Sequence, residues 1–268
     1  MLTRIMTSVV GIPLVIAIIV IGNPLLRYAI MAVSLIALYE FYNVVSKQNK
    51  PVTWIGYGTI VVQYLAFNWV MEYYFVFMAL ITMISLIALV IYYPKYSILD
   101  IGLTLFPVLY VGLMFSFMIL LRDMQEGSFW IWLIAIAAWG SDTFAYFTGK
   151  TIGKHKLAPV LSPKKTIEGS IGGVVGAGIL AYIYTLIYTH YGAFTLRQQM
   201  LWVIIAAILG AIISQFGDLA ASAVKRYYDQ KDYGYILPGH GGILDRFDSF
   251  IFVAPIIYIV VGIVQNAI

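Results

Sequence analysis

Apolar runs of bilayer-spanning length recur along the whole chain, and this feature restricts the folds that the sequence can adopt. A helix of about 20 apolar residues crosses the hydrocarbon core of a membrane. Only 10% of the 268 residues are charged, whereas soluble domains carry about 25%. The sequence therefore predicts an all-α, polytopic integral membrane protein.

We expect about nine transmembrane helices, at residues 5–22, 25–45, 52–70, 73–93, 99–121, 129–149, 169–190, 200–224 and 242–266. Arg4 precedes the first run, as a basic residue does in a signal peptide. No small-residue cleavage site follows that run, and further spans come immediately after it. We therefore expect a retained first helix.

Basic residues are distributed unevenly between the connections, and this indicates an orientation. Connections after even-numbered spans contain Lys47, Lys50, Lys95, Lys150, Lys154, Lys156, Lys164, Lys165, Lys225, Arg226 and Lys231. Connections after odd-numbered spans, with their flanks, contain Arg27, Arg122 and Arg197. The positive-inside rule places the basic connections and the N-terminus in the cytoplasm, and the C-terminus outside. We expect a multi-pass protein of the cell inner (plasma) membrane.

Polar residues divide the chain into two regions. Residues 1–125 contain about five apolar helices with short connections, and Glu40 is their notable intramembrane charge. A lone acid near the end of a span usually extends to the membrane surface or has a structural partner, and a functional role is the alternative. Residues 126–268 contain two long cytoplasmic connections and most of the polar residues, so we expect the active site on the cytoplasmic side of this half. The absence of cysteine excludes disulfides and thiolate chemistry.

Four aspartates lie near the cytoplasmic ends of three spans: Asp142, Asp218, Asp245 and Asp248. Ionised side chains there are costly unless they are paired or hydrated. Asp245 and Asp248 are three residues apart, so their carboxylates lie on one side of a helix. Asp142 could instead pack with Ser141 between helices. A convergence of acids favours a bound cation, and carboxylates with water and phosphate suit Mg²⁺.

Basic and glycine-rich segments accompany these acids. Lys164 and Lys165 come just before a helix with small residues at positions 169, 172, 173, 176 and 178. Lysines beside a helix N-terminus suit a phosphate, although cytoplasmic lysines also occur as topology signals. The small residues predict close packing of that helix. Together these features indicate metal-assisted chemistry on a polyphosphate at the membrane surface.

Two long motifs resemble those of the phosphatidate cytidylyltransferase (CDP-diacylglycerol synthase) family. The downstream motif is "SAVKRYYDQKDYGYILPGHGGILDRFDS" at 222–249, and the upstream motif is "SDTFAYFTGKTIGKHKLAPVLSPKKTIEGS" at 141–170. The matching residues are Ser141, Asp142, Ser162, Pro163, Lys164, Lys165, Thr166, Glu168, Gly169, Ser222, Lys225, Arg226, Lys231, Asp232, Pro238, His240, Gly241, Gly242, Asp245, Arg246 and Asp248. The resemblance is specific to the C-terminal half; the N-terminal half agrees in being polytopic.

The resemblance implies transfer of CMP from CTP to phosphatidate, which gives CDP-diacylglycerol and pyrophosphate. Asp218 and Asp245 are then hypothesised as the principal Mg²⁺ ligands, and Asp142 and Asp248 would support a second cation, divalent or monovalent. Candidate substrate-binding residues are Ser141, Ser162, Lys164, Lys165, Thr166, Lys225, Arg226, Lys231, Asp232, His240, Gly241, Gly242 and Arg246. Arg246 could instead brace the acids, and His240 could donate to a phosphate, neighbour a metal or pack within its loop.

Two other functions remain open. A CTP-dependent polyprenol or lipid kinase would use the same nucleotide with a different acceptor. A cation transporter would use the acids as an ion pathway, but transport sites favour the bilayer midplane between repeats, and the chain has no internal repeat. The expected partners are CTP, phosphatidate and membrane lipid, with no nucleic acid. Apolar and glycine-rich helix faces permit a homodimer.

Overall fold

The computed structural model describes residues 2–190, 199–236 and 241–266. The chain forms two compact units, and neither is a continuous stretch of sequence. The first unit comprises residues 1–116 and 227–246, and the second comprises 117–226 and 247–268. The connection that carries much of the downstream motif therefore folds with the N-terminal helices.

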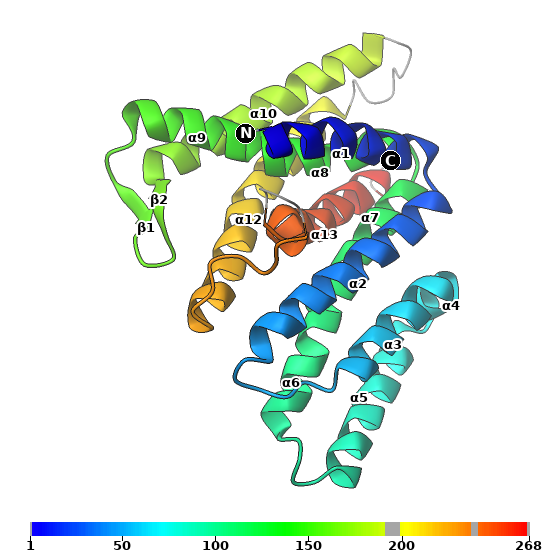
Figure 1. Cartoon of the computed structure of the whole chain (residues 1–268). Coiled ribbons are helices and arrows are strands. Elements are labelled where there is room, and N and C mark those ends of the chain that lie inside the picture. Colours follow the sequence, from blue (N-terminus) through cyan, green and yellow to red (C-terminus); the bar gives the residue numbers. More distant parts are fainter. Residues whose placement is uncertain (1, 191–198, 237–240, 267–268) are drawn as a thin grey trace. The chain divides into compact units, whose positions relative to one another are not determined.

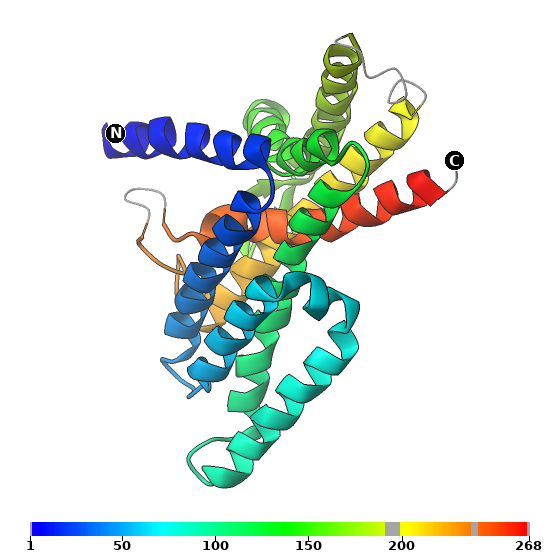
Figure 2. The same ribbon diagram turned by 90° about the vertical axis from the view of Figure 1, so that its right-hand side faces the viewer.

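The first unit is helical. Its elements are α1 (Leu2–Ile21), α2 (Leu25–Val45), α3 (Thr53–Leu65), α4 (Phe67–Glu72), α5 (Tyr74–Ile91), α6 (Ile98–Pro107) and the π-helical segment η1 (Val108–Leu113). Figures 1 and 2 show α3, α5 and α6 side by side. Buried Val52, Ile55, Ala88 and Ile101 form an apolar cluster between them.

A buried carboxylate fixes the start of α6. Asp100 Oδ2 accepts the N–H of Ser97 at 2.8 Å, while Ser97 Oγ accepts the N–H of Asp100 at 3.2 Å. This reciprocal arrangement is a capping box. Asp100 Oδ1 also accepts the N–H of Lys50 at 2.6 Å, so the same side chain ties the α2–α3 connection to α6.

The second unit contains the remaining helices and a hairpin. Its elements are α7 (Met114–Asp123), α8 (Gly127–Ala135), η2 (Ile136–Gly140), α9 (Ser141–Ile152), β1 (Lys156–Ala158), β2 (Ser162–Thr166), α10 (Ile167–His190), α12 (Met200–Tyr227) and α13 (Leu244–Asn266). The first residues of α7 and α13 belong to the first unit. Strands β1 and β2 pair antiparallel, with Lys156 opposite Thr166.

Helices α9 and α10 pack closely in antiparallel directions because glycines face the partner helix. A Cβ on Gly169 would lie 2.7 Å from the carbonyl oxygen of Ala145, and one on Gly173 would lie 2.8 Å from that of Ser141. Real Cβ contacts are never so short, so only glycine permits this separation of the backbones. The expectation of close packing by the small residues of this helix is confirmed.

Glycines also set the approach of α12 to α13 and η2. A Cβ on Gly217 would lie 2.9 Å from the carbonyl oxygen of Asp248, and one on Gly210 would lie 2.8 Å from Ala137 Cβ. Gly217 precedes Asp218, so this close approach brings the helix that carries Asp218 against the turn that carries Asp248. The sequence placed both acids near cytoplasmic ends of their spans without predicting this contact.

Six helices among the described residues are long and apolar enough to cross a membrane: 25–45, 74–91, 98–123, 167–190, 200–227 and 244–265. The integral-membrane, mainly helical fold fits these helices. The expected spans at 5–22, 52–70 and 129–149 are not among them. The chain at 52–70 is divided because the backbone breaks at Ala66, and the 127–152 run contains the polar residues Ser141, Asp142 and Lys150. The β1–β2 hairpin is a departure from an all-α fold.

Candidate functional site

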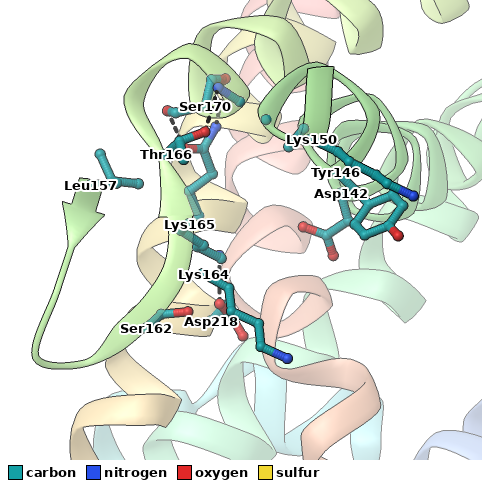
Figure 3. Close-up of a pocket in the computed structure, with 14 residues that line it drawn as sticks. Asp142, Tyr146, Lys150, Leu157, Ser162, Lys164, Lys165, Thr166, Ser170 and Asp218 are labelled. Atoms are coloured by element: carbon teal, nitrogen blue, oxygen red, sulfur yellow. Dashed lines mark hydrogen bonds and ion pairs between the residues drawn. The ribbon is translucent and has the colours of Figure 1, made fainter. Parts of the chain in front are cut away.

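A pocket of about 460 Å³ opens within the second unit, between α9, the hairpin, α10 and α12 (Figure 3). That volume lies in the usual range for small-molecule sites. Its lining residues are Asp142, Ala145, Tyr146, Gly149, Lys150, Leu157, Ser162, Lys164, Lys165, Thr166, Gly169, Ser170, Gln215 and Asp218. The pocket thus brings together six of the residues predicted from the sequence, namely Asp142, Ser162, Lys164, Lys165, Thr166 and Asp218.

Strand β2 presents the basic residues to the pocket, and α10 begins where the strand ends. Thr166 Oγ1 accepts the N–H of Gly169 at 3.1 Å, which caps the first turn of α10. Glu168 in that turn accepts the N–H of Lys154 at 3.0 Å and contacts His155 Nδ1 at 2.6 Å. The hairpin is therefore anchored to α10 at both of its ends, which positions Lys164 and Lys165.

An ion pair crosses the pocket from β2 to α12. Lys165 Nζ lies 2.5 Å from Asp218 Oδ2, and the two side chains are 26% and 29% exposed. Figure 3 shows Lys165 reaching Asp218, with the Lys164 side chain ending beyond them. The predicted phosphate-binding lysine and the predicted metal ligand are therefore direct neighbours.

Asp142 lies in the first turn of α9 and is exposed to the pocket. Tyr146 and Gly149 follow at spacings of four and seven residues, so they share its helix face. Ser141, the preceding residue, is buried with its Oγ against Gly173. Ser141 is not one of the described residues that line this pocket. Its role in substrate binding stays a prediction.

Four polar or charged pocket residues were not predicted as site residues: Tyr146, Lys150, Ser170 and Gln215. Ser170 Oγ donates to Gln215 Oε1, and Gln215 Nε2 donates to the carbonyl oxygen of Ser170 at 3.2 Å. This pair joins α10 to α12 along the pocket wall. The helix spacing from Asp142 to Tyr146 and from Gln215 to Asp218 was the signal available in the sequence.

Asp248 lies behind the pocket lining, in the second unit. It is 6% exposed, and its carboxylate interacts electrostatically with Asp218, Lys225 and Asp142. Lys225 is likewise buried, at 8% exposed, whereas Arg226 is exposed. The buried lysine offsets part of the negative charge that these three acids concentrate.

The remaining predicted residues belong to the first unit. Asp245 Oδ2 accepts the N–H of Tyr233 at 2.8 Å and that of Gly242 at 3.0 Å. This carboxylate thus braces the loop that precedes α13. Gly241 has a positive φ of 86°, a conformation that favours glycine.

Asp232 lines a second pocket, of about 370 Å³, with Glu40 and Tyr39. Lys231 and Arg246 are exposed. Pro238 and His240, which the motif also includes, lie outside the described residues. Their predicted contributions therefore stay predictions.

The donors in the first pocket fit Mg²⁺. Within the parts of the chain that the structure describes, no three acidic or histidine side chains are close enough to share one ion. Mg²⁺ usually takes one or two carboxylates and completes its shell with water and substrate phosphates. Asp142 and Asp218 supply two carboxylates on one pocket, beside lysines suited to phosphate.

Comparison with known proteins shows which family the chain belongs to. Residues 2–264 match the Cytidylyltransferase family. The chain belongs to the cytidylyltransferase family.

Its similarity to named members extends over nearly the whole chain. A phosphatidate cytidylyltransferase of Staphylococcus haemolyticus is 34% identical over 97% of this chain and 98% of its own length. The protein of that name from Staphylococcus aureus shows the same identity and coverage. The protein of that name from Bacillus subtilis is 41% identical, over 61% of this chain and 59% of its own length. The resemblance to the phosphatidate cytidylyltransferase family is therefore confirmed.

Proposed function

We propose that this cytidylyltransferase-family chain transfers CMP from CTP to phosphatidate, which yields CDP-diacylglycerol and pyrophosphate. The observation that carries this function is the first pocket, in which two carboxylates and three lysines of the described residues line one opening. Near-full-length similarity to proteins named phosphatidate cytidylyltransferase supports the choice of substrates.

The reaction joins two anions and requires little proton chemistry. An oxygen of the phosphatidate phosphate attacks the α-phosphorus of CTP, and the bond from that phosphorus to the bridging oxygen of pyrophosphate breaks. A phosphomonoester with a second pKa near 6 is largely dianionic at pH 7, so a strong general base is unnecessary. Catalysis then depends on positioning and on fixed positive charge.

Different residues of the chain would bind the metal and the phosphates. Asp142 and Asp218 would hold Mg²⁺, which when bound would polarise phosphoryl oxygens and offset the charge of the leaving pyrophosphate. Lys165 and Lys164 would bind phosphate oxygens, since both reach the pocket from β2. Asp245 stays a proposed principal metal ligand, as its place in the motif predicts, and Asp248 is proposed to support a second cation. The basic motif residues Lys225, Arg226, Lys231 and Arg246 are proposed to bind phosphate, and Arg246 could instead brace the acids.

The topology of the protein is part of the proposal. We infer about nine transmembrane helices in the inner membrane, a cytoplasmic N-terminus and a site that opens to the cytoplasm. The distribution of lysines supports this orientation, because Lys150, Lys164 and Lys165 all line the pocket. A homodimer stays a prediction.

The test uses purified protein in detergent with dioleoyl phosphatidate, Mg²⁺ and CTP labelled at either the α- or the γ-phosphate. We expect α-label, and not γ-label, to enter the lipid, and chelator or Asp218→Asn to abolish this transfer. In a parallel reaction with a polyprenol in place of phosphatidate, transfer of γ-label to that lipid would instead identify a CTP-dependent kinase. Absence of either transfer in folded protein, with cation flux in vesicles, would identify a transporter and overturn the proposal.

A further inference from the structure

Glu40 places a buried carboxylate against the start of α13. Its side chain projects from α2 and is 1% exposed. Its Oε1 accepts the N–H of Ile243 at 2.9 Å, and its Oε2 accepts the N–H of Leu244 at 2.8 Å. These hydrogen bonds lie within the first unit and connect residues 203 and 204 positions apart in the sequence.

The contact satisfies hydrogen-bonding groups on both sides, namely the first backbone N–H groups of α13 and the buried carboxylate of Glu40. The first N–H groups of a helix have no acceptor within the helix, and the helix dipole makes this end positive. A buried carboxylate, in turn, requires strong donors to offset its lost hydration. Glu40 uses both of its oxygens for this purpose, so it acts as an N-terminal cap supplied by a distant helix.

Two glycines make room for the carboxylate. A Cβ on Gly234 would lie 2.6 Å from Glu40 Oε1, and a Cβ on Gly242 would lie 2.6 Å from the same atom. The backbone on either side of the loop therefore closes around the Glu40 side chain. Gly242 in the downstream motif has a packing reason to be glycine that is independent of any phosphate.

The residue that follows this cap is a candidate metal ligand. Leu244 is adjacent to Asp245, which accepts the N–H groups of Gly242 and Tyr233 through Oδ2. The N–H groups of Gly242, Ile243 and Leu244 are thus held by two carboxylates, one from α13 and one from α2. A shift of the Glu40 side chain would be transmitted directly to Asp245.

We propose that Glu40 is a positioning residue, which fixes the first turn of α13 and thereby the placement of Asp245 for catalysis. This inference rests on the proposed function. Glu40 itself is buried and acts through the backbone at Ile243 and Leu244. A misplacement of catalytic groups by about 1 Å can lower a rate by about 100-fold, so a small displacement of this turn has a large effect.

The decisive variant is Glu40→Gln, which preserves the shape but replaces one acceptor oxygen with an N–H₂ group facing a backbone N–H. Asp100→Asn is the matched control. Asp100 is also buried, belongs to the same unit and accepts the backbone N–H groups of Lys50 and Ser97, but it caps α6. The two variants remove equivalent interactions at different helices.

We would measure CMP transfer, its dependence on Mg²⁺ and CTP concentration, and amide hydrogen exchange in residues 243–248. For Glu40→Gln we expect kcat to fall by about 10- to 100-fold, KM for CTP to change by less than about threefold, and exchange at Ile243 and Leu244 to accelerate. For Asp100→Asn we expect wild-type kcat and unchanged exchange in α13, with a lower unfolding temperature.

Gly234→Ala provides a second route, because the added Cβ displaces the carboxylate without removing it. It should reproduce the loss of kcat even if Glu40→Gln fails to fold. Folded Glu40→Gln or Gly234→Ala protein with wild-type kcat would overturn the positioning role, as would an equal loss of kcat in Asp100→Asn. Wild-type protein that transfers no CMP would instead overturn the proposed function.

Discussion

Lys165 on β2 and Asp218 on α12 form an ion pair, with 2.5 Å between Nζ and Oδ2. The lysine suits a phosphate and the aspartate suits a cation, so the proposed function has a metal-bound nucleotide contact both members of this pair. An ion pair with this degree of exposure contributes little stability by itself. The pair holds the lysine and the aspartate next to each other at the pocket.

Replacement of Lys165 with methionine should separate cation binding from turnover. We expect Mg²⁺ to bind several-fold more tightly, because Asp218 loses a competing positive charge, and kcat to fall by about 100-fold, because a phosphate contact is lost. The stabilisation of the protein by increasing Mg²⁺ reports binding without turnover. Lys156→Met is the control, since Lys156 is exposed on the neighbouring strand β1 and is not among the residues that line the pocket. Unchanged Mg²⁺ binding and turnover in Lys165→Met would contradict this role.

Asp218 and Asp248 should contribute unequally to turnover and to Mg²⁺ binding. Asp218 lines the pocket, whereas Asp248 is buried behind it and interacts with Asp218 electrostatically. We expect Asp218→Asn to lower kcat by at least about 1,000-fold and to weaken Mg²⁺ binding, and Asp248→Asn to lower kcat by about 10- to 100-fold. Initial rates over a range of Mg²⁺ concentrations distinguish the two. A greater loss in Asp248→Asn would move the principal metal ligand away from the pocket lining.

Gly169→Ala should disrupt the wall shared by α9 and α10. The new Cβ would lie 2.7 Å from the carbonyl oxygen of Ala145 and 2.9 Å from Thr166 Oγ1, and backbone cannot move aside cheaply. We expect a loss of about 1–3 kcal/mol in unfolding free energy, together with reduced activity. Gly102→Ala is the control, because nothing lies within 4 Å of its Cβ position. That substitution should gain about 0.5–1 kcal/mol from helix propensity. Equal effects of the two substitutions would refute the packing argument.

The orientation can be tested with a single thiol, because the natural chain has no cysteine. Val160 lies between β1 and β2 and is 86% exposed. A membrane-impermeant maleimide should label Val160→Cys in inverted inner-membrane vesicles and not in intact spheroplasts. Labelling only from the outer side would reverse the proposed topology.

The sequence singled out four of the five charged residues that line the pocket, Asp142, Lys164, Lys165 and Asp218, and missed Lys150. The aspartates were singled out because an intramembrane charge is costly and the lysines because they precede a helix N-terminus, and their roles stay predictions. The β1–β2 hairpin could not be predicted, since three- and five-residue strands of mixed polarity give no clear alternation. Gln215 and Ser170 were missed for a related reason, as their hydrogen bonds form only when α10 and α12 meet.

Glu40 illustrates the limit for long-range contacts. The sequence left open whether this acid extends to the membrane surface, has a structural partner or is functional, because the donors are backbone N–H groups and carry no sequence signature. Likewise, the nine expected spans rest on apolar length alone, whereas a break such as the one at Ala66 depends on local backbone conformation. Long-range hydrogen bonds and interruptions of helices could therefore be identified only from the structure.

The cap on α13 has a consequence for biosynthesis. The hydrogen-bond donors of Glu40 are encoded 203 residues downstream of it. At roughly 5–20 residues per second, the ribosome needs about 10–40 s to add that stretch. Until then the Glu40 carboxylate of α2 lacks these two backbone partners, so the first unit reaches its final state only after the start of α13 has been synthesised.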